Sequence, residues 1–164
     1  MLVATPIAEA AASFHLDEHV LEKGFPVFTA EESLRQPAPH SNHAVWIFGH
    51  MIRCRASVLK FIGREGEFER TWLPLFNRGE KLREASAYPS WQELLEAWNE
   101  VTPILHKALD EISPELLDRP SPEGVPSADK KISGLINFFA YHEAYHAGQL
   151  GYITKWLGHD GLVG

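Results

Sequence analysis

Apolar side chains recur at three- and four-residue steps along four long stretches of the chain, which is the spacing of amphipathic helices. The first stretch starts near Pro6, a residue suited to a first helical turn, and stops at Gly24 and Pro26. The second runs from Ser41, the expected N-cap, to about Gly63. Few segments alternate between apolar and polar residues as strands do, so the pattern predicts an all-α chain.

Two capping-box spacings mark further helix starts. Thr29 and Glu32 predict a short helical turn between the first and second helices. Ser90 and Glu93 predict the start of a third helix, which runs through Leu109.

Long connections separate these helices. Residues 63–89 are too apolar for a solvated linker and predict a packed loop with about one helical turn. The proline-rich residues 113–126 give the chain room to cross the molecule, and a fourth helix is expected over about residues 128–156, closed by Gly158. We therefore expect one domain over residues 1–164, a four-helix bundle with long connections.

The composition narrows the class of protein. A chain of 164 residues, 45% of them hydrophobic, suits one globular domain, and its net charge of −7 argues against nucleic acid as a partner. The lone Cys54 excludes an intrachain disulfide and a cysteine-rich zinc cluster. Because no basic leader and no long apolar run is evident, we expect a cytoplasmic protein without a membrane partner.

Two histidines lie four residues apart on the apolar face of the expected fourth helix. His142 and His146 are one helical turn apart, so their ring nitrogens can converge on one metal ion. A buried imidazole needs a partner for each nitrogen, and a metal together with a hydrogen-bond acceptor satisfies both. The alternative is a pair of core histidines that bond to neighbouring side chains.

A third ligand must come from another helix. His50 is the best candidate because it lies midway along the second helix on its apolar side, and His43, near the start of that helix, is the second choice. His15 and His19 are expected at the surface or in contact with the metal ligands, rather than as ligands themselves. The other histidines are expected in loops or on an outer face: His40, His106 and His159. Three neutral imidazoles suit zinc, nickel or ferrous iron and leave a position open.

The string His142-Glu143-x-x-His146 is also the zincin signature, in which the glutamate is the general base. A metzincin would carry glycine and a third histidine where this chain has Gln149 and Tyr152. Only 18 residues follow His146, which leaves little chain for the later carboxylate ligand of other zincins. A zincin-type metallohydrolase is therefore the least favoured interpretation.

A family resemblance rests on two strings, Trp46-Ile47-Phe48-Gly49-His50 and His142-Glu143-x-x-His146-Ala147-Gly148-Gln149-Leu150. They resemble the DinB-like (DinB/YfiT-type) superfamily of bacterial metal-binding four-helix bundles, and the resemblance covers nearly the whole chain. It implies a metal triad of His50, His142 and His146 and a homodimer. Family members include thiol transferases that use bacillithiol or mycothiol, a thiol-dependent isomerase and proteins without an established activity.

The function that we expect is a metal-dependent transfer of a thiol to a small electrophilic substrate. An open metal position can bind a low-molecular-weight thiol and lower its pKa. The same ligand set also allows a metal-activated water, and fold alone does not fix the reaction. The alternative from another class is a noncatalytic metal-binding or stress-associated bundle.

Residues next to the histidines complete the expected site. Glu143 lies about 100° around the helix from His142. There it is either exposed, or it supports the metal ligands by hydrogen bonding or acts as a catalytic base. Tyr145 and Gln149 flank the pair and are expected to orient a cofactor or substrate. Cys54 lies one turn after His50 and is expected as a small buried residue rather than a reactive thiol.

Two expectations concern packing. Gly148 and Gly151 weaken the fourth helix, so the close approach of another helix is their expected reason. Trp72 and Phe76 of the long loop are expected at the mouth of a substrate pocket.

Overall fold

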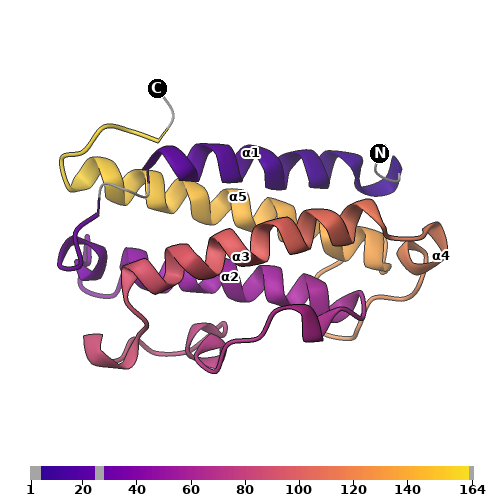
Figure 1. Ribbon diagram of the computed structural model, residues 1–164, viewed down its shortest axis with the longest axis horizontal. Coiled ribbons are helices and arrows are strands. Elements are labelled where there is room, and N and C mark those ends of the chain that lie inside the picture. The colour runs from indigo at the N-terminus through magenta and orange to yellow at the C-terminus, as the bar shows by residue number, and fades with distance from the viewer. Residues whose placement is uncertain (1–4, 25–27, 163–164) are drawn as a thin grey trace.

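The computed structural model describes residues 5–24 and 28–162, and within these ranges it holds helices and no strand (Figure 1). Four helices are long: α1 Ala8–Gly24, α2 Ala44–Phe61, α3 Trp91–Asp110 and α5 Ile132–Trp156. The short α4, Pro114–Leu117, lies in the connection between α3 and α5. The prediction of an all-α bundle with four long helices is confirmed.

The long helices lie side by side, with α5 packed along both α1 and α2, and α2 packed along α3 (Figure 1). Each contributes fully buried side chains to one core, among them Phe14, Phe48, Trp98 and Leu135. Burial of such apolar surface is the main force that holds an amphipathic helix in place. Because α2 and α5 pack directly against each other, side chains on their facing sides can share one site.

The helix starts follow from local capping. Both capping boxes are confirmed, since Thr29 and Glu32 exchange backbone-to-side-chain hydrogen bonds and so do Ser90 and Glu93. The N-cap of α2 is His43, whose Nδ1 accepts from the Trp46 backbone N–H at 3.1 Å. The expectation that Ser41 would cap this helix is wrong.

The start of α5 is later than expected, at Ile132 rather than near residue 128. The carboxylate of Asp129 explains the difference, because it accepts from the backbone N–H groups of Lys131 and Gly134 at 2.8 and 3.1 Å. These bonds satisfy N–H groups at the helix start and hold the preceding residues in a turn.

The connection between α2 and α3 contains three short 3-10 turns rather than one: η4 Glu65–Glu67, η5 Leu73–Phe76 and η6 Ala85–Ala87. Phe76 is fully buried against Gly49 of α2, and a Cβ at Gly49 would overlap its ring. Glycine is therefore required here for close approach. Phe76 and Trp72 pack edge to face at 5.6 Å, so this loop is part of the packed structure.

The expectation for the glycines of α5 is wrong. Nothing lies within 4 Å of the position that a Cβ would take at Gly148, and Gly151 faces the side chain of Leu162 in the C-terminal tail. At neither position would a Cβ meet another helix within 4 Å. Among the described residues, no helix combines the length and apolar character needed to span a bilayer.

Candidate metal centre

Four potential metal donors meet between α2 and α5. α2 contributes His50 and Cys54, four residues apart, and α5 contributes His142 and His146 at the same spacing. The ring centroid of His50 lies 5.2 Å from that of His142 and 5.0 Å from that of His146. The centroids of His142 and His146 are 4.4 Å apart. Ligand atoms of His50, Cys54 and His142 all lie within 4.8 Å of one another. The structure therefore brings together all three histidines that the sequence pattern selected.

Hydrogen bonds fix the proton positions on two of these rings. His50 Nδ1 lies 2.6 Å from the carbonyl oxygen of Phe76, and His146 Nδ1 lies 2.7 Å from Gln149 Oε1. Both partners are acceptors, so each Nδ1 carries the proton and donates it. The Nε2 atoms of His50 and His146 are left with free lone pairs, as a metal ligand requires.

Burial keeps the imidazoles neutral. It lowers the pKa of His142 to about 4, with smaller contributions from His50 and Arg78, and it lowers the pKa of His146 to about 4. Burial also lowers the pKa of His50, although the bond to Phe76 opposes the fall. Neutral rings can donate to a cation without first losing a proton at neutral pH.

The polar atoms inside the cluster lack enough protons to satisfy one another. His142 Nε2 lies 3.2 Å from His146 Nε2, and Cys54 Sγ lies 3.6 Å from His50 Nε2 and 3.7 Å from His142 Nδ1. Burial raises the pKa of Cys54 to about 12, so its thiol keeps its proton. Inside the cluster, His142 then supplies one N–H and Cys54 one S–H, whereas the three histidines present three nitrogen lone pairs. One lone pair is left without a proton, and it suits a cation. The donor set therefore fits a divalent metal.

A pocket of about 680 Å³ opens on one side of these donors. His50, Cys54 and His142 form part of its wall, and Tyr145 lies at it with more than half of its surface exposed. The pocket is large enough for a small organic molecule. Phe76 and Trp72 do not line it, contrary to expectation; the loop residues that do are Asn77 and Arg78.

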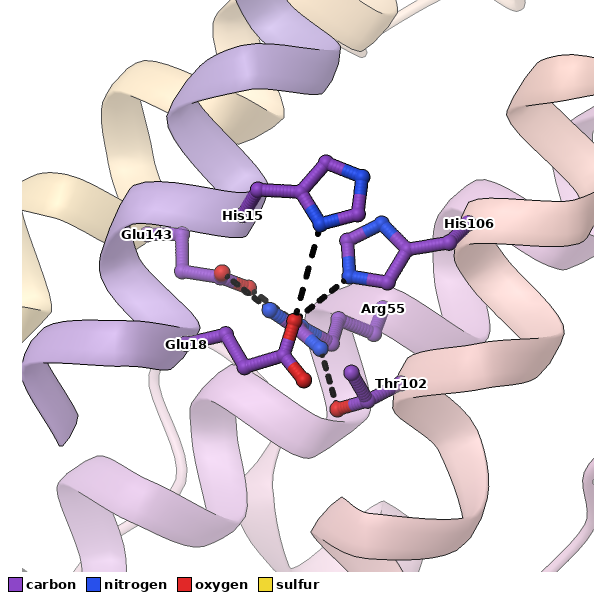
Figure 2. Close-up of polar contacts among 6 residues, drawn as sticks. All are labelled: His15, Glu18, Arg55, Thr102, His106 and Glu143. Atoms are coloured by element: carbon purple, nitrogen blue, oxygen red, sulfur yellow. Dashed lines mark hydrogen bonds and ion pairs between the residues drawn. The ribbon is translucent and has the colours of Figure 1, made fainter. Parts of the chain in front are cut away.

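Glu143 is buried in the core, where its carboxylate faces the guanidinium of Arg55 (Figure 2). Its side chain is 1% exposed, and its two oxygens accept from Nε and Nη2 of Arg55 at 2.8 and 2.7 Å. The possibility of an exposed helix glutamate is therefore wrong. Both oxygens are occupied by Arg55, which is unlike the free general base of a zincin.

Arg55 connects the helices behind the histidines. Besides the ion pair with Glu143 of α5, it donates to Thr102 Oγ1 of α3 at 2.5 Å (Figure 2). It also stacks on Trp98, 3.6 Å from the ring centroid. The helical pattern did not predict a role for Arg55. A usable indication existed, because Arg55 and Glu143 are charges on otherwise apolar helix faces, and buried charges are paired.

A second polar cluster lies near the outer edge of α1 and α3. His106 Nε2 lies 2.8 Å from Glu18 Oε2, His15 Nδ1 lies 3.8 Å from the same oxygen, and the two rings stack at 3.6 Å (Figure 2). These three groups could also hold a cation, but His15 is exposed. His106 is mostly buried rather than in a loop or on an outer face, which corrects that expectation.

The remaining histidines lie apart from the α2–α5 cluster. His43, the second choice for the third ligand, caps α2 instead and is buried, with 5% of its surface exposed. His19 is exposed on α1, and His40 lies in the turn before α2. His159 lies after α5, with its Nε2 3.0 Å from Glu32 Oε1.

Comparison with known proteins assigns the family. No curated protein matched this chain. The profile of the DinB superfamily matches residues 14–150, a range that includes the two strings around His50 and His142 and all four donors. That match covers well over half of the sequence and agrees with the helical bundle. The chain belongs to the DinB superfamily.

Proposed function

We propose that this protein binds a divalent metal ion, zinc, nickel or iron, through His50, His142 and His146. We further propose that it is a metal-dependent enzyme that transfers a low-molecular-weight thiol to a small electrophilic substrate. The observation that carries the proposal is the convergence of three imidazoles whose lone pairs outnumber the protons available to them. A cytoplasmic location stays a prediction.

Each neighbouring group has a role in this proposal. The Phe76 carbonyl and Gln149 accept from Nδ1 of His50 and His146, which leaves the Nε2 atoms of both rings available to hold an ion. Tyr145, whose hydroxyl accepts from Gln149 at 3.2 Å, lies where a thiol or substrate would enter. When bound, the ion would supply a Lewis acid that lowers the pKa of a thiol. Glu143 and Arg55 position the helices rather than exchange protons with substrate.

Cys54 separates this proposal from its alternative, a noncatalytic metal-binding bundle. If the thiol joins the three histidines as a ligand, the site has four protein donors and resembles closed structural sites. If it does not, one position stays open for chemistry. Cobalt substitution tests this, because a cobalt–sulfur bond gives a near-ultraviolet charge-transfer band. We expect no such band, and a band that disappears in Cys54→Ala would favour the closed, noncatalytic site.

Elemental analysis tests the triad. Metal content per chain should fall sharply in His50→Ala and stay unchanged in His19→Ala, which removes an exposed histidine of α1. Unchanged content in His50→Ala would remove His50 from the site.

Thermal unfolding with a panel of low-molecular-weight thiols tests the transfer reaction. A thiol that binds the folded, metal-loaded protein raises its Tm. No shift with any thiol would count against the transferase and favour the noncatalytic alternative.

A further inference from the structure

The pocket beside the histidines is positively charged in a chain that is acidic overall. The chain has 22 Asp and Glu residues against 15 Lys and Arg. Among the described residues that line the pocket are Arg53 and Arg78, and none is Asp or Glu. The local charge is therefore opposite to that of the whole molecule, which favours an anion in this pocket.

The guanidinium of Arg53 is held in place without being neutralised. Its Nε donates to Asn77 Oδ1 at 2.9 Å, and its Nη1 hydrogen-bonds to Ser57 Oγ. Both partners are uncharged, and Nη2 has no partner among the described residues. Arg53 thus offers a fixed positive charge with a free donor.

Arg78 supplies the second charge. It is exposed next to Asn77 and makes no ion pair with any carboxylate that the structure describes. By contrast, Arg64 and Arg70 outside this pocket each pair with glutamate. Two unneutralised guanidinium groups at one pocket form a suitable site for a carboxylate or phosphate-like group.

Another part of the pocket wall is apolar. Phe138 and Phe139 of α5 pack against each other at 5.6 Å, and Phe61 of α2 lies 6.1 Å from Phe139. Val125 and Pro126 extend this surface. An aromatic or aliphatic group can therefore be buried next to the charged part.

We propose that the pocket selects a small organic anion, with its carboxylate or phosphate-like group on Arg53 and Arg78 and its apolar part on Phe138 and Phe139. This deepens the proposed function by naming the class of substrate. Only one part of it rests on that function, namely that the reacting group of the bound anion lies next to His50 and His142. The anion-binding residues belong to this chain and do not depend on a metal.

Calorimetric titration at constant ionic strength tests the proposal with three probes of similar shape: 3-phenylpropionate, 2-phenylethylphosphonate and the neutral 3-phenylpropionamide. At least one anion should bind about tenfold more tightly than the amide, before and after treatment with a chelator. The two anions distinguish a carboxylate from a phosphate-like group. In Arg78→Gln the preference should fall to about threefold or less, with metal content unchanged, whereas Arg64→Gln should keep it.

Two outcomes would overturn the proposal. One is the absence of any preference for the anions in the unaltered protein, including the absence of measurable binding. The other is a preference for the anions that survives in both Arg78→Gln and Arg53→Gln but disappears with the chelator. The anion would then bind the metal itself rather than the arginines, and the proposed metal site would be unaffected. Conversely, a preference for anions in a protein whose metal content does not depend on His50 would reject the triad and leave this proposal intact.

Discussion

A single carboxylate, that of Asp17, shows how strongly the interior affects one residue. Asp17 is 7% exposed, its Oδ2 has no hydrogen-bond partner among the described residues, and burial raises its pKa to about 7. The charge of Glu143 adds to the rise and that of Arg55 opposes it. The folded protein therefore keeps a proton that the unfolded chain loses above pH 4.

The contribution of Asp17 to the free energy of unfolding should consequently decrease as pH rises from about 4 to about 7 and level off above that, opposite in sign to the contribution of the buried histidines. Asp17→Asn removes this dependence, so the variant should gain roughly 1–3 kcal/mol relative to the unaltered protein between pH 5 and pH 8. Urea denaturation of both metal-free proteins at the two pH values measures the gain. Parallel pH profiles would show that Asp17 ionises normally.

Gly49 is the second residue whose replacement has a defined consequence. In Gly49→Ala the new Cβ meets the ring of Phe76, and overpacking of this kind costs about 1–3 kcal/mol. The displaced Phe76 would also move the carbonyl that orients His50, so metal affinity should fall as well. Gly66→Ala in η4 is the control, because nothing lies within 4 Å of its Cβ. Equal effects of both changes on urea denaturation and metal titration would contradict the assignment.

At the scale of the elements, the ion pair of Arg55 and Glu143 fixes α2 against α5. Arg55→Met keeps most of the side-chain length but leaves a buried carboxylate without its partner, which should cost about 3–5 kcal/mol in urea denaturation. Adding Glu143→Leu should recover much of this loss. Arg64→Met, which breaks surface pairs with Glu67 and Glu111, should change stability by about 1 kcal/mol or less. A small loss in Arg55→Met would mean that the pair adds little to helix packing.

The elements also show what a sequence can specify. Helical periodicity was sufficient to place His50, His142 and His146 on inward faces, since side-chain direction follows from residue number within a helix. The partner of His50 was not predictable, because a main-chain carbonyl such as that of Phe76 carries no residue signature. The helix starts at His43 and Ile132 depended on individual side-chain bonds, which a periodic pattern does not contain. Arg53, which follows His50 on α2, and Arg78, which lies in the long loop, are far in sequence from His142 and His146, and only the fold joins them.

At the scale of the whole molecule, the homodimer implied by family resemblance stays a prediction. Leu16 of α1 and Tyr152 of α5 are 62% and 64% exposed beside a shallow groove between these helices, which gives a candidate contact face. Leu16→Glu should shift the protein toward the monomer in sedimentation velocity. Gln92→Glu, which adds the same charge on α3, should not. A monomeric unaltered protein would reject the dimer.

The hydrogen bond between Phe76 and His50 joins the long loop to α2, and it has a thermodynamic corollary for the proposed metal site. If occupancy of the histidines favours the ring orientation that this bond maintains, then an ordered loop must favour occupancy by the same factor, since linkage is reciprocal. Removing the ion should therefore accelerate amide exchange over residues 73–78 more than in α3. Uniform exchange rates with and without metal would show that loop and ligand behave independently.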